Sequence, residues 1–418
     1  MMLSIFSRIS RTEQRHCLTS NLNISVNSPD SDRSGLFCEE GMMSKLSFSE
    51  VSAIDSDKIH ILGRTGRQKQ PLPVFFNGGG VEVVVTGSEF WIEVETDSDV
   101  NEMWVALEIN GAFIARQMLL PGEHSLCLFR SMEPTTPKRV RFYRELQAMN
   151  DDPKVNLLIK GFKHDGEFQS VPKYERKLEF IGDSITSGEG SYGAFEDVDW
   201  IPMYMSASVN YATMTSKALN ADYHLISQGG WGVFVGWDND VRHNLPSIYE
   251  KVCGLANGEE NKKLGAAEDY DFSSWQPDAI IINLGTNDIT SFNQPEFVNP
   301  DDGKTYKMRM NSDGTRNRED ELKIVDATIN FLTMLRRHNP NAQIIWCYGM
   351  LGSDLNLVLT EGINKYKEKA GDEKVSFFQL PDTTLDTFGS HMHPGIKSHQ
   401  NATKELVHYL RNKLNCQD

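Results

Sequence analysis

The sequence predicts an α/β chain in which an antiparallel β-sandwich precedes a three-layer α/β/α domain with a parallel sheet. Three observations predict this fold class. The chain has 418 residues, whereas a single hydrophobic core seldom exceeds about 250–300 residues, so two domains are expected. Its first half shows the period-two apolar pattern of half-buried strands. Its second half alternates apolar strands with amphipathic helices, as in a parallel sheet covered on both faces.

The period-two pattern extends from about residue 58 to 164. In the segment EFWIEVETD, the side chains of Phe90, Ile92 and Val94 fall on one face of the predicted strand. The segment EMWVALEING repeats the alternation. Further candidate strands lie near residues 81, 112, 124, 138 and 154. Turn signals containing glycine separate these segments, which favours an antiparallel sandwich.

From about residue 177, five apolar segments are candidate strands: KLEFIG, YHLIS, AIIINLG, QIIWCYG and VSFFQL. Helices are expected near residues 206–220, 319–338, 357–369 and 396–414. The last helix has one core-facing stripe, formed by Ala402, Leu406, Leu410 and Leu414. The stretch 290–318 is polar and rich in Asn, Asp and Gly, so we expect a surface loop there.

These patterns set the expected domain boundaries. Residues 1–44 include a segment rich in Ser, Asn and Asp, which predicts a disordered N-terminal extension. Residues 45–168 should form the β-sandwich, and residues 172–418 should form the α/β domain. The segment QSVPKYER, residues 169–176, is the expected linker.

The charge balance restricts the partners of this protein. The chain has 42 Lys and Arg residues against 58 Asp and Glu residues, a net charge of −16. Nucleic acid and anionic membranes should be repelled, whereas a neutral substrate such as a sugar is compatible. No stretch approaches the ~18 consecutive apolar residues of a membrane span. The N-terminal residues MMLSIFSRISRTEQRHC lack the apolar core of a secretory signal, which favours a cytoplasmic location. Composition gives no signal for an oligomeric state.

The six cysteines lie far apart and form no CxxC pair: Cys17, Cys38, Cys127, Cys253, Cys347 and Cys416. This spacing argues against a zinc site and against a dense disulfide framework. We therefore expect free thiols, and neither a metal nor an organic cofactor.

Four short motifs follow predicted strands or open a helix. The first, GDSIT, comes directly after KLEFI and places the hydroxyl of Ser184 at the carboxyl end of a strand, where open parallel sheets bind ligands. Alone, Asp183 or Ser184 could equally cap the next turn. The second, SQGGWG, is a glycine-rich turn in which the N–H of Gly230 could bind a developing oxyanion. Structural turns use glycine for the same steric reason.

The third motif, NLGTND, ends the strand AIII and offers the side-chain amide of Asn287 as a second oxyanion donor. It also has the composition of an ordinary strand-ending turn. The fourth, HMHPG, precedes the final helix and contains His393, which could serve a serine as general base. Two other interpretations of this motif are an exposed histidine and half of a metal site formed by His391 and His393.

The order of the four motifs makes a functional interpretation of the whole set stronger than that of any single motif. Ser, Gly, Asn and His occur at four strand-to-helix edges of one predicted sheet, and one crevice can collect all four. GDSIT, SQGGWG, GTND and the late HP resemble the four blocks of the SGNH (GDSL-type) hydrolases over about residues 177–415. With the preceding β-sandwich, the chain is most similar to carbohydrate esterase family 2. Members of that family pair a jelly-roll domain with an SGNH hydrolase domain and deacetylate sugars or xylan-type polysaccharides.

The resemblance implies a role for each motif. Ser184 is the expected nucleophile and His393 the expected general base. The N–H groups of Gly230 and Ser184, with the side chain of Asn287, are the expected oxyanion hole. Asp183 belongs to the first motif and should shape the turn.

The sequence departs from the family pattern at two positions. The aspartate that commonly lies three residues before the catalytic histidine is replaced by Ser390. Some members of the esterase family are thought to hold this histidine with a backbone carbonyl instead, so the resemblance implies that a backbone carbonyl orients His393. Asp386 and Asp382 are the alternatives for this role. The residue before the histidine, often aromatic in relatives, is Met392, so stacking on a sugar must come from elsewhere. The candidates are Trp231, Trp200 and Trp237.

The expected activity is that of a serine esterase that removes O-acetyl groups from a mono-, oligo- or polysaccharide such as xylan, through an acyl-enzyme on Ser184. Within the same class, the alternative is an SGNH esterase or thioesterase acting on lipid or aryl acyl groups. From another class, the β-sandwich and the missing aspartate would also suit a carbohydrate-binding protein with a degenerate site. The sandwich either binds substrate or only braces the hydrolase domain.

Overall fold

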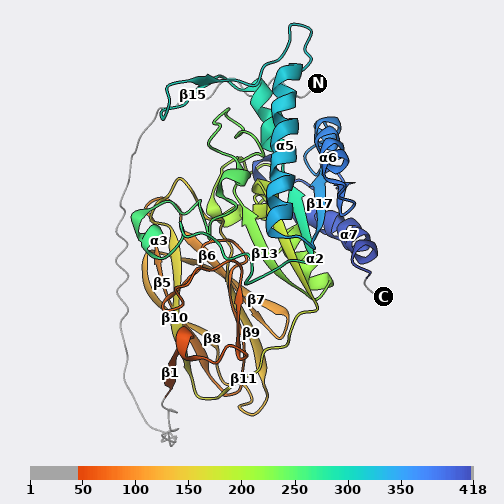
Figure 1. Ribbon diagram of the computed structural model, residues 1–418. Coiled ribbons are helices and arrows are strands. Elements are labelled where there is room, and N and C mark those ends of the chain that lie inside the picture. The colour runs from red at the N-terminus through yellow and green to blue at the C-terminus, as the bar shows by residue number, and fades with distance from the viewer. Residues whose placement is uncertain (1–45, 416–418) are drawn as a thin grey trace, which may run out of the picture. The chain divides into compact units, whose positions relative to one another are not determined.

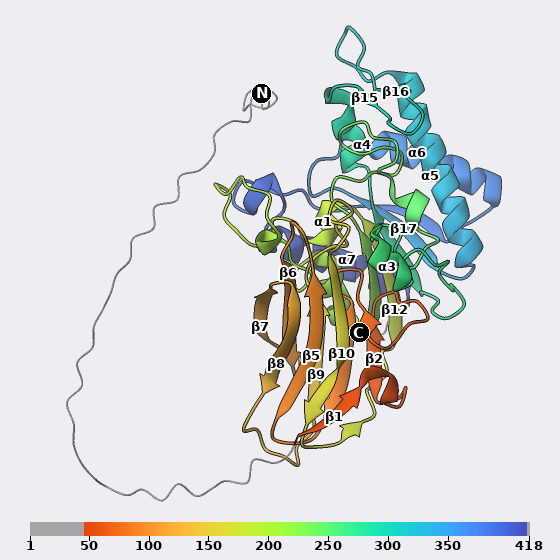
Figure 2. The ribbon, with the colours of Figure 1, turned by 90° about the vertical axis from the view of Figure 1, so that its left-hand side faces the viewer.

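The computed structural model describes residues 46–415. These residues lie in one compact unit, which Figures 1 and 2 show in two views. The two large antiparallel sheets end at Gln169, and the parallel sheet begins at Arg176. The predicted disordered extension, residues 1–44, lies outside the described residues. None of the helices formed by residues 46–415 combines the length and the apolar character that crossing a bilayer requires.

The cysteines within the described part of the chain have no disulfide partner there. Cys127, Cys253 and Cys347 are free thiols, as predicted, and the last two are buried. The predictions for Cys17, Cys38 and Cys416 lie outside the described residues.

Two antiparallel sheets form the first half of the described chain. In spatial order, the first sheet comprises β1 (Ser47–Glu50), β10 (Asn156–His164), β5 (Phe90–Asp97) and β8 (Gly122–Phe129), with β3 (Leu72–Pro73) paired to β10. The second comprises β11 (Phe168–Gln169), β4 (Gly80–Val85), β9 (Lys138–Arg144), β6 (Met103–Ile109) and β7 (Ala112–Leu119), with β2 (Ile59–Leu62) paired to β4. Buried apolar side chains from both sheets pack into one core. The predicted β-sandwich is therefore confirmed.

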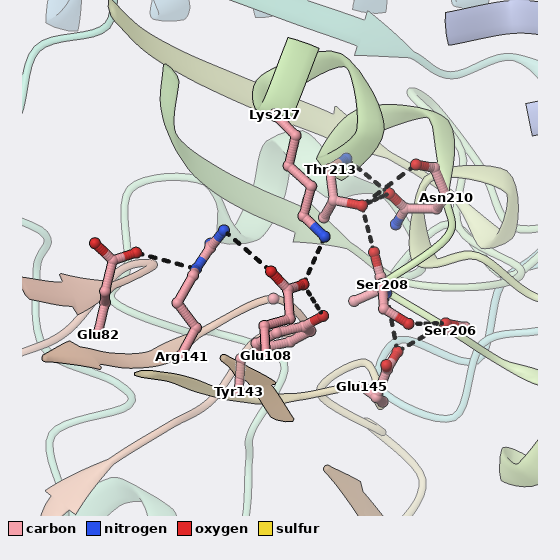
Figure 3. A network of polar contacts seen from close by, with 12 residues as sticks. Glu82, Glu108, Arg141, Tyr143, Glu145, Ser206, Ser208, Asn210, Thr213 and Lys217 are labelled. Carbon is pink, nitrogen blue, oxygen red and sulfur yellow. Dashed lines mark hydrogen bonds and ion pairs between the residues drawn. The ribbon is translucent and has the colours of Figure 1, made fainter. Parts of the chain in front are cut away.

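The two strands used to predict the sandwich behave differently. In β5 the predicted alternation is confirmed, because Phe90, Ile92 and Val94 are buried and the residues between them are partly exposed. In β6 the second face is buried as well, Glu108 included. This difference arises because Lys217, on helix α2 (Tyr211–Ala218), forms an ion pair with Glu108 and covers that face (Figure 3).

All five predicted segments of the parallel sheet are confirmed as strands. In spatial order they are β13 (Ala221–Ser227), β12 (Arg176–Gly182), β14 (Ala279–Asn283), β17 (Gln343–Tyr348) and β18 (Val375–Gln379). The chain passes from β12 to β13 on one side and then to β14 on the other. In open α/β sheets, ligands bind beyond the carboxyl ends of the strands at such a change of direction. The topology therefore predicts a site beyond β12, β13 and β14.

Helices cover both faces of this sheet, which confirms the three-layer α/β/α fold class (Figure 1). The other long helices are α5 (Arg318–His338), α6 (Asn356–Ala370) and α7 (Ile396–Lys413). Helices α5 and α6 pack on one face, against side chains such as Ile282 and Trp346. Helices α2 and α7 pack on the other face, where Ala402, Leu406 and Leu410 of the predicted stripe are buried and Leu414 is partly buried.

Short helical segments lie in the loops between these elements. They are α1 (Ser184–Ser187), α3 (Glu259–Lys263) and α4 (Thr286–Thr290), with 3₁₀ turns at Val51–Ala53, Pro202–Tyr204, Leu245–Ile248, Ser291–Asn293 and Ser390–Met392. Three of these segments, α1, α4 and the turn Ser390–Met392, contain or adjoin residues of the predicted site.

Two predicted segments differ from the structure. The helix expected over 206–220 begins only at Tyr211, because the Asn210 side chain caps it by accepting from the N–H of Thr213 at 2.9 Å. The stretch 290–318 was expected to be a surface loop, but it contains the hairpin β15 (Phe297–Val298) and β16 (Thr305–Tyr306). Part of this stretch is tied to the body of the protein, since the N–H of Met308 donates to the Asn239 side chain at 2.8 Å.

Candidate active site

Ser184 is the first residue of α1, directly after β12. The turn between strand and helix is tight, since a Cβ at Gly182 would clash with the side chain of Thr186. Asp183 caps the helix, because its carboxylate accepts from the N–H of Ile185 at 3.0 Å. The sequence GDSIT therefore places the Ser184 hydroxyl at the carboxyl end of β12, as predicted from the motif.

His393 lies against Ser184 although the two are far apart in the sequence. The distance from His393 Nε2 to Ser184 Oγ is 2.9 Å. His393 follows the turn Ser390–Met392 and precedes α7. Gly190 makes this approach possible, since a Cβ there would lie 2.6 Å from the Cβ of His393. The structure thus brings together the two residues on which the predicted chemistry depends.

A backbone carbonyl orients the imidazole of His393. Its Nδ1 lies 2.7 Å from the carbonyl oxygen of His391. His391 and Met392 both have left-handed backbone conformations, with φ of 50° and 53°. Such conformations are strained for residues with side chains and are found mainly where surrounding structure imposes them. The strained turn directs the His391 carbonyl toward the ring that it orients.

The acidic alternatives for this role lie elsewhere. Asp386 and Asp382 are exposed, and their carboxylates accept from the hydroxyl of Thr384 and the N–H of Gly352. Neither therefore substitutes for the missing aspartate. Ser390, at the position of that aspartate, is buried, and its hydroxyl donates to the carbonyl of Tyr192 at 3.1 Å.

A carboxylate that the sequence analysis missed lies beside the histidine. Glu189 is buried, and its Oε1 lies 2.7 Å from His391 Nδ1 and 3.5 Å from His393 Nδ1. Burial alone would raise the pKa of Glu189, but its interactions with His393 and His391 outweigh burial and lower the pKa below its ordinary value. The hydrogen bond to Glu189 raises the pKa of His391. The one sequence signal was the acid in GEG, five residues after the nucleophile.

These three residues also bear on the alternative of a metal site. One ligand atom from each of Glu189, His391 and His393 lies within 4.8 Å of the others. The two imidazole rings are parallel, however, with an interplanar angle of 4° and centroids 5.4 Å apart. Both ring nitrogens of His393 already lie within hydrogen-bonding distance of protein oxygens, Nδ1 of the His391 carbonyl and Nε2 of Ser184 Oγ. Hydrogen bonding accounts for the arrangement better than metal ligation does.

The two other motifs end beside this pair. Gly230 has a φ of 80°, a left-handed conformation that favours glycine, and its carbonyl accepts from the N–H of Trp237 at 3.1 Å. Asn287 lies in the first turn of α4, and its side-chain amide donates to the carbonyl of Trp231 at 2.9 Å. The same amide lies 3.4 Å from the carboxylate of Asp183. The first and third motifs are therefore in direct contact.

Asp288, which the sequence analysis did not single out, fixes the segment after the glycine turn. Its carboxylate accepts from the N–H groups of Val233, Phe234 and Val235 at 2.9, 2.8 and 3.1 Å. Burial raises the pKa of Asp288 to about 6, although these hydrogen bonds favour its charged form. The aspartate of GTND thus links the second and third motifs.

The β-sandwich also contributes a residue to the site. Gln147, just after β9, accepts from the N–H of Gly229 at 2.8 Å. The fully buried Arg144 fixes this segment by donating to the carbonyls of Leu146 and Gln147 at 2.6 and 2.5 Å. Burial lowers the pKa of Arg144 to about 10. No sequence pattern indicated that Gln147 would meet the glycine turn.

The predicted sugar-binding aromatic residues differ in exposure. Trp231 is only 7% exposed and stacks on His243, so it belongs to the core and offers no free ring face. Trp237 is 48% exposed and adjoins Gly230, and Trp200 is 36% exposed and lies near Glu189. Met392 is 51% exposed, next to His393. Trp237, Trp200 and Met392 are therefore the exposed candidates beside the Ser–His pair.

Known proteins are similar to this chain in sequence and fold. A family model described as GDSL-like Lipase/Acylhydrolase matches residues 178–406, more than half of the chain. A solved acetyl xylan esterase from the rumen bacterium Butyrivibrio proteoclasticus is 85% identical, with a TM-score of 0.88. That match covers 89% of this chain and 99% of the esterase.

Two more distant relatives extend the comparison. The cellulase/esterase CelE of Acetivibrio thermocellus is 30% identical over 353 residues, which is 82% of this chain. The chain spans only 37% of the length of that relative. A family two carbohydrate esterase from Clostridium thermocellum, solved with cellohexaose, is 24% identical with a TM-score of 0.69. This match covers 85% of this chain and 99% of the esterase, and at this identity it shows a shared fold.

Proposed function

The chain belongs to the GDSL-like lipase/acylhydrolase family, and we propose that it is a serine esterase that removes O-acetyl groups from xylan-type carbohydrates. The hydrogen-bonding distance of 2.9 Å between Ser184 Oγ and His393 Nε2 is the observation that supports catalysis most directly. The name of the relative at 85% identity, an acetyl xylan esterase, supports the substrate class. A net charge of −16 is compatible with a neutral sugar chain.

The first half of the reaction forms an acyl-enzyme. Ser184 Oγ attacks the acetyl carbonyl carbon while His393 Nε2 accepts the hydroxyl proton. The negative charge that develops on the carbonyl oxygen receives hydrogen bonds from the N–H groups of Gly230 and Ser184 and from the Asn287 amide. As the carbon–oxygen bond to the sugar breaks, His393 returns the proton to the departing sugar oxygen.

The second half releases acetate. A water molecule gives a proton to His393 Nε2 as its oxygen attacks the acetyl-serine carbonyl. The bond to Ser184 Oγ then breaks, and His393 returns the proton to the serine. Both halves require that Nε2 be unprotonated at the start, so the proton must reside on Nδ1. The carbonyl of His391, 2.7 Å from Nδ1, selects this tautomer.

The test is acetate release from acetylated sugars by the wild-type chain and by Ser184→Ala. We expect the wild type to deacetylate xylan-type substrates and the variant to lose nearly all turnover. The panel should include mono-, oligo- and polysaccharides, so that the size of the preferred sugar can be compared.

The same assay separates the alternatives. A preference for long-chain over acetyl nitrophenyl esters would identify an esterase of lipid or aryl acyl groups instead. Sugar affinity with neither turnover nor labelling of Ser184 by an organophosphonate would indicate a carbohydrate-binding protein. If Ser184→Ala kept most of the activity, the proposal would be wrong.

A further inference from the structure

We infer that Glu189 is a positioning residue that supplies the negative charge of the missing aspartate, stabilising His393 while this histidine holds the proton of Ser184. In serine hydrolases with a triad, the aspartate both orients the imidazole and compensates its positive charge. Here the two tasks are divided, because the His391 carbonyl that orients the ring has no net charge. The inference rests on the proposed function and assigns a role to a residue outside the four family motifs.

Distance and burial support this division. The Oε1 of Glu189 lies 3.5 Å from His393 Nδ1, on the side of the ring opposite Ser184. The Glu189 side chain is 9% exposed and that of His393 is 16% exposed. An opposite charge within about 4–6 Å favours the charged form of a group, and shielding from water strengthens the effect. The carboxylate is thus close enough to act on His393 without replacing the His391 carbonyl.

The other titratable groups near His393 do not supply this charge. Burial raises the pKa of Asp183 to about 7, and Asp183 is committed to capping α1. Burial lowers the pKa of His399, on α7, to about 3, so this neighbour is neutral at pH 7. Glu189 itself is kept ionised, because its interactions with His393, His391 and Trp200 outweigh its burial and lower its pKa.

His391 also contacts the carboxylate of Glu189 and so reduces the effect of that carboxylate on His393. It lies 2.7 Å from Glu189 Oε1, and its ring is parallel to that of His393 at 5.4 Å. When His391 is protonated, its charge cancels much of the negative charge that Glu189 presents to His393. Removing the His391 ring should therefore increase the effect of Glu189, whereas removing the carboxylate should abolish it.

The main test is Glu189→Gln, which keeps the shape of the side chain and removes its charge. We expect kcat for an acetyl ester to fall about 10- to 100-fold with KM little changed. This is less than the ~10⁴-fold loss in serine proteases, because the tautomer stays fixed by the His391 carbonyl. The lower limb of the pH profile of kcat/KM should move to lower pH by about 0.5–1 unit, because the imidazolium loses its partner.

Two further variants show that the effect is electrostatic. Glu189→Asp should restore part of the lost kcat. His391→Asn keeps the backbone carbonyl and suits the left-handed conformation, and it should move the lower limb of the profile to higher pH. Asp386→Asn is the matched control, since this exposed carboxylate contacts Thr384 and should leave the profile unchanged.

The outcomes separate this inference from the proposed function. If the wild type releases acetate and Ser184→Ala does not, the function holds. A Glu189→Gln profile that then matches the wild type, or a fall in kcat without a shift of the limb, would overturn the charge role of Glu189 alone. Histidine-ring NMR gives a readout independent of turnover. The titration midpoint of the His393 signal should fall in Glu189→Gln, and an unchanged midpoint would also overturn the inference.

Discussion

At the scale of single residues, burial changes the acid chemistry of Asp183. This aspartate is fully buried, caps α1 and accepts from the N–H of Ile185 at 3.0 Å. Burial raises its pKa from 3.8 to about 7, and the charges of Asp288 and Glu189 act in the same direction. The folded protein therefore retains a proton that the unfolded chain releases near pH 4.

This retention predicts a pH-dependent effect of Asp183→Asn on stability. The native state binds more protons than the unfolded state between about pH 4 and pH 7, so the contribution of Asp183 to stability falls over this range. Asparagine caps a helix as well as aspartate does and does not titrate. We expect the unfolding free energy of the variant, relative to wild type, to increase from pH 5 to pH 7 and then level off. The change should be a few kcal/mol at most, since one pKa unit corresponds to about 1.4 kcal/mol.

Urea denaturation at pH 5, 6, 7 and 8 measures this difference. Ser184→Ala is the matched control, because it alters the same turn without removing a carboxyl group, and its difference from wild type should be the same at every pH. A difference for Asp183→Asn that does not change with pH would show that the carboxyl group does not retain its proton in the folded protein.

At the scale of elements, the segment that follows β9 connects the sandwich to the candidate active site. Gln147 accepts from the N–H of Gly229 at 2.8 Å, next to the proposed oxyanion donor Gly230. In the same segment, the carboxylate of Glu145 accepts from the Ser206 hydroxyl at 2.9 Å and from the N–H of Ser208 at 3.0 Å (Figure 3). The sandwich thus contacts the loops of the site as well as the helices.

We predict that Gln147→Ala impairs the glycine turn. Without its acceptor, the N–H of Gly229 no longer fixes the turn, and the Gly230 N–H is less well placed for the oxyanion. The expected result is a fall of about tenfold in kcat with KM little changed, smaller than the ~10²–10³ that follows the loss of an oxyanion donor itself. Steady-state kinetics on an acetyl ester measures it. The control is Gln117→Ala, on the exposed face of β7, and equal effects of the two variants would contradict the prediction.

At the scale of the whole molecule, buried polar contacts join the sandwich to the parallel-sheet half. Arg64 follows β2 of the sandwich, is buried, and pairs with Glu179 of β12 at 2.9 Å. Glu108 of β6 is also buried and pairs with Lys217 of α2, whose side chain is 37% exposed, so the burial of this second pair is only partial (Figure 3). Breaking a buried ion pair leaves an uncompensated charge, which commonly costs about 3–5 kcal/mol. Unfolding of either half would therefore leave charged groups of the other half without their partners.

This coupling predicts one cooperative thermal transition for residues of both halves. Differential scanning calorimetry should give a single peak whose calorimetric and van't Hoff enthalpies agree. Independent domains joined only by a linker at 169–176 would instead give two transitions. Two resolved peaks, or a peak with a calorimetric enthalpy well above the van't Hoff value, would contradict the prediction.

The sequence by itself determined the features that depend on local pattern. Alternation at period two identified strands such as β5, and continuous apolar segments identified all five parallel strands. The motifs around Ser184 and His393 specified which residues should meet, because side chains at the carboxyl ends of neighbouring parallel strands share one crevice. The prediction of a loop at 290–318 was incomplete because it rested on local composition. Composition cannot predict a contact with a distant residue, such as that between Met308 and Asn239.

Only the tertiary structure decided which groups contact the imidazole of His393. From the sequence, a backbone carbonyl, Asp386 and Asp382 were the candidates for orienting His393. The distances in the structure select the carbonyl of His391. They also add Glu189, which is 204 positions away from His393 along the chain and 3.5 Å away in space. The tertiary structure also decided that Gln147 of the sandwich contacts the glycine turn. The physical reason is that periodicity reflects the burial of a residue within its own element. Electrostatic and hydrogen-bond partners depend instead on how distant elements pack.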